Sequence, residues 1–370
     1  MSIHQREPEQ PVQTTAVTPE EDPTNSLPLR EPLDRRKHAR LPKRRWRLIE
    51  WVGMVLALLL IIGIVLGVFL LLKGRSTTQS TLAPVPQGNP PAHATYDAHA
   101  PTALQGQTVN VTLTVKEVLV SIAPGIAYHA WTFNGTVPGP VIRVHQGQTV
   151  HFTLVNEGSM PHSIDFHAAQ TPWNVNYQEV AAGKSVSFDW QANYPGVFMY
   201  HCGAPTVIYH MANGMYGAVI VDPATGWTPA QEYVLVQSEF YTAKLADGSY
   251  AVDPQKLSNE DPDYVVFNGY ANQYKIDPLT AKAGQRIRLF LVNAGPTQFS
   301  AFHVIGAIFS DTYIDGNPAN HMVGNQTVTI PPGGGIVVEL TIPQAGLYPF
   351  VTHSFADVSK GALGVIKVTP

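Results

Sequence analysis

One short stretch of the chain concentrates side chains that bind soft metal ions. The segment YHCGAPTVIYHMANGM (200–215) places Cys202, His210 and Met215 in the spacing Cys-x7-His-x4-Met, and His162 lies upstream. Two imidazoles, a thiolate and a weak axial thioether form the ligand set of a blue, or type 1, copper. Cys202 is the only cysteine, so it cannot form an internal disulfide. We therefore predict that these four residues bind a type 1 copper.

A second group of histidines interleaves with the first. His201 immediately precedes Cys202, and His167 follows His162 by an odd number of residues. On a regular strand successive side chains point to opposite faces, so His167 and His201 are expected to face away from the first site. We predict that they bind a second metal ion. The peptide link between residues 201 and 202 would then carry an electron between the two sites.

The chain repeats three of its segments in the same order. The repeated pairs are GQTVHFTLVN (147–156) with GQRIRLFLVN (284–293), YPGVFMYHC (194–202) with the looser AGLYPFVTHS (345–354), and GMYGAVIV (214–221) with GALGVIKV (361–368). Alternation of apolar Val150, Phe152 and Leu154 with polar residues is typical of β-strands. The repeats predict an all-β fold with two tandem β-sandwich domains, residues 104–223 and 224–370.

The second repeat keeps one of the metal-binding side chains. His353 aligns with His201, whereas Ser354 stands where the first repeat has its thiolate and Ala362 where it has its thioether. The second repeat therefore cannot form a blue site, but His353 can supply a third imidazole to the second metal. Three histidine ligands with one open position are typical of a catalytic metal.

The first hundred residues have a different composition. Residues 1–47 are rich in Pro, Glu, Gln and Thr and end in a basic run, which predicts a disordered cytoplasmic tail. Residues 51–72 carry no charge, and a helix of that length, about 33 Å, crosses a hydrocarbon core of roughly 30 Å. We predict a single-pass membrane anchor over 48–73, a flexible linker over 74–103 and both domains outside the cytoplasm. A cleaved signal peptide is the alternative.

The overall composition limits the possible functions. The chain is 44% hydrophobic and 14% charged and contains 30 Gly and 31 Pro, which suits short strands joined by loops. Its net charge of -4 provides no argument for nucleic acid as a partner.

These motifs resemble those of the copper-containing nitrite reductases, within the multicopper oxidase and cupredoxin superfamily. The resemblance covers residues 105–370 and rests on four motifs: FNGTVPGPVI, HSIDFHAA, HC…H…GMYGAVIV and FHVIG…THS…KGALG. It implies two cupredoxin-like Greek-key sandwiches, a type 1 copper on the four residues named above, and a type 2 copper on His167, His201 and His353. It also implies a homotrimer in which His353 reaches the type 2 copper of a neighbouring chain.

The same resemblance implies a reaction and its partners. The substrate would be nitrite, reduced to nitric oxide with an electron from an external donor such as a cupredoxin or a cytochrome c. Asp165 and His303 would be the catalytic acids, and Ile305 would shape the substrate site. Judged without the resemblance, Asp165 fits a hydrogen-bonded turn equally well, and His303 fits a satisfied core histidine. The segment QTPWNVNYQEV departs from the family's pattern, and its Trp173 and Tyr177 could narrow the route to either copper.

Two other functions are weighed against the reductase. A laccase-like oxidase needs a trinuclear copper cluster, commonly built on His-x-His pairs, and residues 105–370 contain no such pair. A non-enzymatic cupredoxin electron carrier needs only the blue site, which would leave His167, His201 and His353 without a role. Copper content distinguishes them: two per chain for the reductase, one for the carrier and four for the oxidase.

Overall fold

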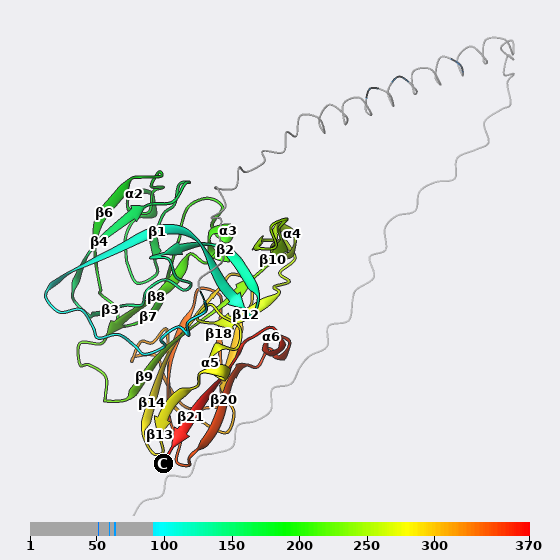
Figure 1. The fold of residues 1–370 in the computed structure, drawn as a ribbon. Coiled ribbons are helices and arrows are strands. Elements are labelled where there is room, and N and C mark those ends of the chain that lie inside the picture. The colour runs from blue at the N-terminus through cyan, green and yellow to red at the C-terminus, as the bar shows by residue number, and fades with distance from the viewer. Residues whose placement is uncertain (1–50, 52–58, 60–62, 64–91) are drawn as a thin grey trace, which may run out of the picture. The chain divides into compact units, whose positions relative to one another are not determined.

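A computed structural model describes residues 51, 59, 63 and 92–370 of the chain. The described residues from 92 onward lie within one compact unit (Figure 1). The predicted tail, nearly all of the predicted anchor (48–73) and most of the predicted linker lie outside the described residues. Among the described residues, no helix is long and apolar enough to cross a membrane.

The first repeat contains eight strands and two short helices. They are β1 (Thr108–Ala123), β2 (Ile126–Phe133), β3 (Ile142–His145), β4 (Thr149–Asn156), β5 (Asp165–Phe166), α2 (Trp173–Asn176), β6 (Ser185–Gln191), β7 (Gly196–His201), α3 (Val207–Ala212) and β8 (Tyr216–Asp222). Strands β3, β8, β7 and β5 form one sheet, and β2, β1, β4 and β6 belong to another.

The second repeat has the same layered plan. Its elements are β9 (Gln231–Phe240), β10 (Thr242–Lys244), β11 (Tyr250–Val252), α4 (Pro254–Ser258), β12 (Tyr264–Phe267), α5 (Gln273–Ile276), β13 (Leu279–Lys282), β14 (Arg286–Gly295), β15 (Ser300–Val304), β16 (Phe309–Ile314), β17 (His321–Asn325), β18 (Thr327–Ile330), β19 (Gly335–Thr341), β20 (Gly346–Thr352), α6 (Phe355–Ser359) and β21 (Leu363–Thr369). The sheet orders are β12-β9-β14-β19-β16-β17 and β13-β21-β20-β15-β18.

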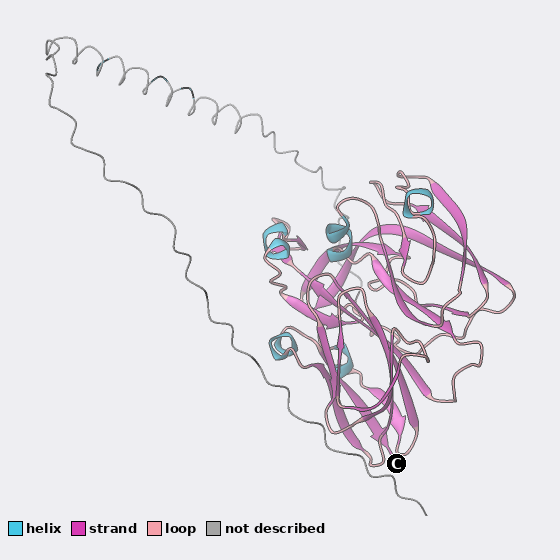
Figure 2. Cartoon of the chain, turned by 180° about the vertical axis from the view of Figure 1, so that it is seen from behind, coloured by secondary structure: helices cyan, strands magenta, loops and turns pink. Residues whose placement is uncertain are grey.

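The described chain is therefore mostly β, as predicted, and its sheets are consistent with two cupredoxin domains (Figure 2). The exact domain limits stay a prediction. The hairpin β10–β11 belongs to the second repeat in sequence, but β11 pairs with β2, so it extends a sheet of the first repeat.

The period-two pattern places a dense apolar layer between the sheets of the first repeat. In β4, Val150, Phe152 and Leu154 are fully buried while His151 is exposed. The same apolar cluster includes Cys202 and Met215. Two of the predicted metal ligands thus lie in a core whose packing fixes their position.

A network of ion pairs joins the two repeats through one contact, between Arg143 and Glu232. Arg143 on β3 contacts Asp222 of the first repeat at 2.9 Å and Glu232 of the second at 2.7 Å. Glu232 also pairs with Arg288 on β14, which is fully buried and whose second partner is Glu339 on β19, each at 2.5 Å. Removing one member of a buried pair leaves the other charge uncompensated. The charges of this network therefore stabilise the fold only as a complete set.

We expect Arg288→Leu to lower the free energy of unfolding of the metal-free protein by about 3–5 kcal/mol, because Glu339 would be left buried without its main partner. Arg286→Leu is the matched control. Arg286 lies on the same strand and contacts the same Glu339 at 2.6 Å, but its side chain is 45% exposed, and its loss should cost about 1 kcal/mol or less. Denaturant unfolding measures the free energy of unfolding of both variants. Equal decreases in the two variants would show that the buried Arg288 stabilises the fold no more than the exposed Arg286 does.

Candidate metal centres

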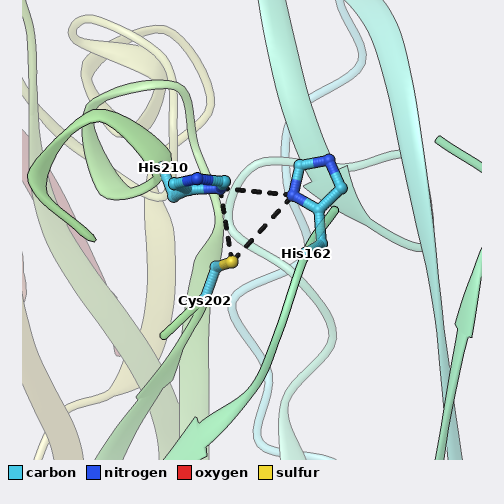
Figure 3. Close-up of side chains that lie close together, drawn as sticks. All are labelled: His162, Cys202 and His210. Carbon is cyan, nitrogen blue, oxygen red and sulfur yellow. Dashed lines mark hydrogen bonds between the residues drawn. The ribbon is translucent and has the colours of Figure 1, made fainter. Parts of the chain in front are cut away.

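Three of the predicted type 1 ligands meet around one point in the first repeat. The two Nδ1 atoms of His162 and His210 lie 3.2 Å apart. The Sγ atom of Cys202 lies 3.3 Å from Nδ1 of His210 and 3.9 Å from Nδ1 of His162 (Figure 3). All three side chains are buried. One metal ion at bond lengths of about 2.0–2.3 Å fits between these three atoms.

Backbone hydrogen bonds hold the ligand loop in place. Cys202 directly follows β7, and its N–H donates to the carbonyl of Met215 at 3.1 Å. The N–H of Met215 donates to the carbonyl of His210, also at 3.1 Å. Met215 is fully buried beside β8. The N–H of Ser163 donates to the sulfur of Cys202 at 3.2 Å, which helps to orient the sulfur.

The protonation states of the buried ligands suit a soft cation. Burial raises the pKa of the Cys202 thiol to about 11, so the thiolate needs a bound cation to form at neutral pH. Burial, together with the neighbouring His162, lowers the pKa of His210 to about 4, so its imidazole is neutral and able to coordinate. Thiolate, thioether and imidazole together favour copper over hard cations.

Two residues beside this group escaped the sequence analysis. The ring of Trp131 on β2 lies with its centroid 4.9 Å from that of His210 and 5.7 Å from that of His162. The carboxylate of Glu117 on β1 lies 3.8 Å from Nε2 of His162. Neither residue stands at a ligand spacing, so only the pairing of β1 with β2 reveals them. Burial acts to raise the pKa of Glu117, but the neighbouring His162 ring and the hydrogen bonds from Ser159 lower it overall.

The second group of predicted ligands also forms. The Nε2 atoms of His167 and His201 lie 3.2 Å apart, and Oδ2 of Asp165 lies 3.7 Å from Nε2 of His201. The Nδ1 atom of His201 lies 2.9 Å from the carbonyl oxygen of Cys202, and Nδ1 of His167 lies 3.2 Å from that of Gly333. Donation from Nδ1 to these carbonyls leaves both Nε2 atoms unprotonated and free to bind one metal.

Burial lowers the pKa of His201, which keeps its ring neutral and suited to coordination. His167 is exposed, so this second group opens toward the surface, unlike the first. The carbonyl of Gly333 comes from the loop before β19 in the second repeat. A backbone carbonyl carries no residue-type signal, so this contact of His167 could not be predicted from the sequence.

The two groups diverge as predicted, but not for the reason given for His162 and His167. The expectation of a regular strand through 162–167 is wrong, because β5 covers only Asp165–Phe166. His162 forms an isolated bridge with Val180, and His167 lies in the turn after β5. The irregular path, rather than strict alternation, sends the two rings to separate groups.

The remaining predicted site residues lie on the second repeat. His303 on β15 and His353 after β20 have ring centroids 5.6 Å apart. The Nδ1 atom of His303 lies 2.6 Å from the carbonyl oxygen of Gln326. Ile305, next to β15, is exposed. Neither metal-ligand group found among residues 92–370 includes His353, so this single chain does not bring it to His167 and His201.

The segment after HSIDFHAA places its two aromatic residues differently. Trp173 projects from α2 and is 76% exposed. Tyr177 is buried in the apolar cluster of the first repeat, and its hydroxyl donates to the carbonyl of Phe166 at 3.3 Å. Its own carbonyl accepts a hydrogen bond from the hydroxyl of Ser163 at 2.6 Å. Tyr177 thus holds the segment that carries Ser163 and Phe166 from within the core.

Comparison with known proteins agrees with this geometry. A family model described as multicopper oxidase matches residues 114–226. The chain is 38% identical over 298 residues to a copper-containing nitrite reductase of Neisseria meningitidis, covering 76% of each chain. It is 40% identical to that of Neisseria gonorrhoeae over 269 residues, which is 70% of this chain and 68% of the other.

Solved structures give the same result. The copper nitrite reductase of Nitrosomonas europaea matches with a TM-score of 0.66 and 39% identity, over 71% of this chain and 94% of that one. A multicopper oxidase matches with a TM-score of 0.64 at 24% identity, which supports the fold alone. From its identity to the Neisseria enzymes over most of their length, this chain belongs to the family of copper-containing nitrite reductases.

Proposed function

We propose that this protein is a copper-dependent reductase that converts nitrite to nitric oxide. The observation that carries the proposal is the position of His201 and Cys202, which are adjacent in the chain but contribute to separate metal-ligand groups. When bound, copper supplies a one-electron centre in the first group and an anion-binding redox centre in the second. The peptide link between residues 201 and 202 is the shortest covalent path between them.

The proposed ligands follow from the two groups. His162, Cys202, His210 and Met215 would hold the type 1 copper, in a buried setting that limits rearrangement of the ligands when the charge of the ion changes. His167 and His201 would hold the type 2 copper and leave coordination positions open toward the exposed side.

The third type 2 ligand is proposed to come from a second copy of the chain. His353 is exposed, as are Ile305 and Phe355, and the ring centroid of Phe355 lies 5.0 Å from that of His353. Supplying His353 to the His167–His201 pair of a neighbouring copy would complete three imidazoles and cover these apolar side chains. We therefore propose a homotrimer, in which Ile305 would form an apolar wall of the nitrite site.

Proton supply is assigned to Asp165 and His303. Nitrite takes up one electron and two protons, loses one oxygen as water and becomes nitric oxide. Asp165 is partly exposed and lies 3.7 Å from Nε2 of His201, so it can reach an anion bound beside that ring. His303 donates from Nδ1 to Gln326, which leaves its Nε2 able to take up and deliver a proton.

The location of the protein is also a proposal. The basic run followed by the uncharged residues 51–72 supports a single-pass anchor over 48–73, with residues 104–223 and 224–370 as domains outside the cytoplasm. An electron donor such as a cupredoxin or a cytochrome c would then meet the type 1 site on that side of the membrane.

The copper-loaded full-length protein is expected to contain two coppers per chain and to form nitric oxide from nitrite under anaerobic conditions with a chemical reductant. Elemental analysis and a nitric oxide electrode measure the two quantities. One copper per chain without nitric oxide formation would favour the electron carrier, and four coppers with oxygen consumption would favour the oxidase.

Cys202→Ala is expected to abolish the visible thiolate-to-copper absorption and donor-driven turnover while the second group keeps its copper. His201→Ala is the reciprocal variant, which should keep the visible absorption and lose the second copper. Absorption spectra and copper counts test the pair. Normal donor-driven turnover by Cys202→Ala would refute the relay through residues 201 and 202.

Asp165→Asn is expected to retain both coppers and to slow nitrite turnover by about 10²–10⁴-fold, because the amide cannot deliver a proton. Asp189→Asn is the matched control, since Asp189 also pairs with a histidine, His151 at 2.6 Å, but on an exposed part of the sheet. Steady-state rates of nitrite turnover, measured for both variants, test this role of Asp165. An unchanged rate for Asp165→Asn would remove Asp165 from the mechanism.

A further inference from the structure

The buried ring of His162 has one nitrogen without a partner. Its Nδ1 faces Cys202 and His210 (Figure 3). Its Nε2 is fully buried and has no hydrogen-bond partner among the described residues. A histidine that binds metal through Nδ1 carries its proton on Nε2. That proton needs an acceptor, because a buried donor without one is costly.

Glu117 offers the acceptor. Its Oε1 lies 3.8 Å from Nε2 of His162, about 1 Å beyond an ordinary hydrogen bond. The carboxylate is only 10% exposed, and His162 is its one ion-pair partner in the described part of the chain. The neighbouring Lys116 pairs with Glu157 instead, at 3.7 Å. The charge of Glu117 is therefore directed at the ligand ring rather than neutralised by a lysine.

The loop before His162 holds this carboxylate in place. The N–H of Ser159 donates to Oε1 at 2.8 Å, and the Ser159 hydroxyl contacts the two carboxylate oxygens at 3.1 and 3.0 Å. A Cβ atom at Gly158 would lie 3.0 Å from Oε1 and 3.3 Å from Cδ2 of His162. Glycine at 158 thus permits the close approach of loop, carboxylate and ring.

We propose that Glu117 is a positioning residue that fixes the ring of His162 and lowers the reduction potential of the type 1 centre. A carboxylate that accepts the distal N–H of a metal-bound histidine raises the basicity of that ligand. Its negative charge in a buried setting also favours the more highly charged, oxidised ion. The inference rests on the proposed type 1 copper, but it does not depend on nitrite as the substrate.

The test measures the reduction potential of the full-length, copper-loaded protein in the absence of nitrite. The visible thiolate-to-copper absorption monitors the oxidation state of the site. Glu117→Gln keeps an acceptor but removes the charge. We expect the preference of the site for Cu(II) over Cu(I) to fall about tenfold, which raises the potential by about 59 mV. Glu117→Ala, which removes both, should raise it at least as far. Glu157→Gln, which removes an exposed charge from the same loop, is the matched control and should leave the potential unchanged.

Ser159→Ala separates an electrostatic role from a purely structural one. The Ser159→Ala variant loses the hydroxyl contacts to the carboxylate but keeps the charge and the backbone N–H that holds Oε1, so the potential should not rise. The potential of Ser159→Ala also tests the proposal if the Glu117 variants fail to fold. Potentials that match the Glu157→Gln control in the Glu117 variants, or a rise in Ser159→Ala, would overturn the proposal. Failure to form nitric oxide with the potential shift intact would count against the proposed function alone.

Discussion

The structure depends on the end of β7, where two consecutive residues serve different metal-ligand groups. His201 is the last residue of the strand, and Cys202 follows it. The antiparallel pairing of β7 with β8 brings Met215 beside Cys202, and the pairing of β7 with β5 brings Asp165 opposite His201. Because both pairings fix one backbone, the two groups cannot move independently. A shift in register would displace both at once.

Burial then gives the two groups different chemistry. The first lies in the apolar cluster between two sheets, where the thiol resists ionisation and the imidazole of His210 stays neutral. Such a rigid, dry site suits an ion that changes charge without changing ligands. The second group contains the exposed His167 and the partly exposed Asp165, which suits an ion that must exchange water for an anion.

Sequence alone predicted what local covalent order controls. The spacing from Cys202 to Met215, the adjacency of His201 and the period of two in β4 all survive in the structure, since each reflects neighbouring residues on one backbone. It could not predict contacts made by distant or backbone groups. Glu117 reaches His162 only through the packing of β1, and Gly333 acts through its carbonyl. The irregular backbone before β5 includes an isolated bridge between His162 and Val180, which no alternation pattern encodes.

The position of His353 links the proposed reaction to assembly. In one chain the His167–His201 pair supplies two imidazole nitrogens, while His353 and His303 stand together on the second repeat. On the proposed assignment, an isolated chain would hold its type 1 ligands complete and its type 2 ligands incomplete. A single chain could then accept an electron at its type 1 site, whereas nitrite reduction would require the trimer. The carbonyl of Gly333 adds a further condition, because His167 keeps its orientation only while the two repeats stay packed together.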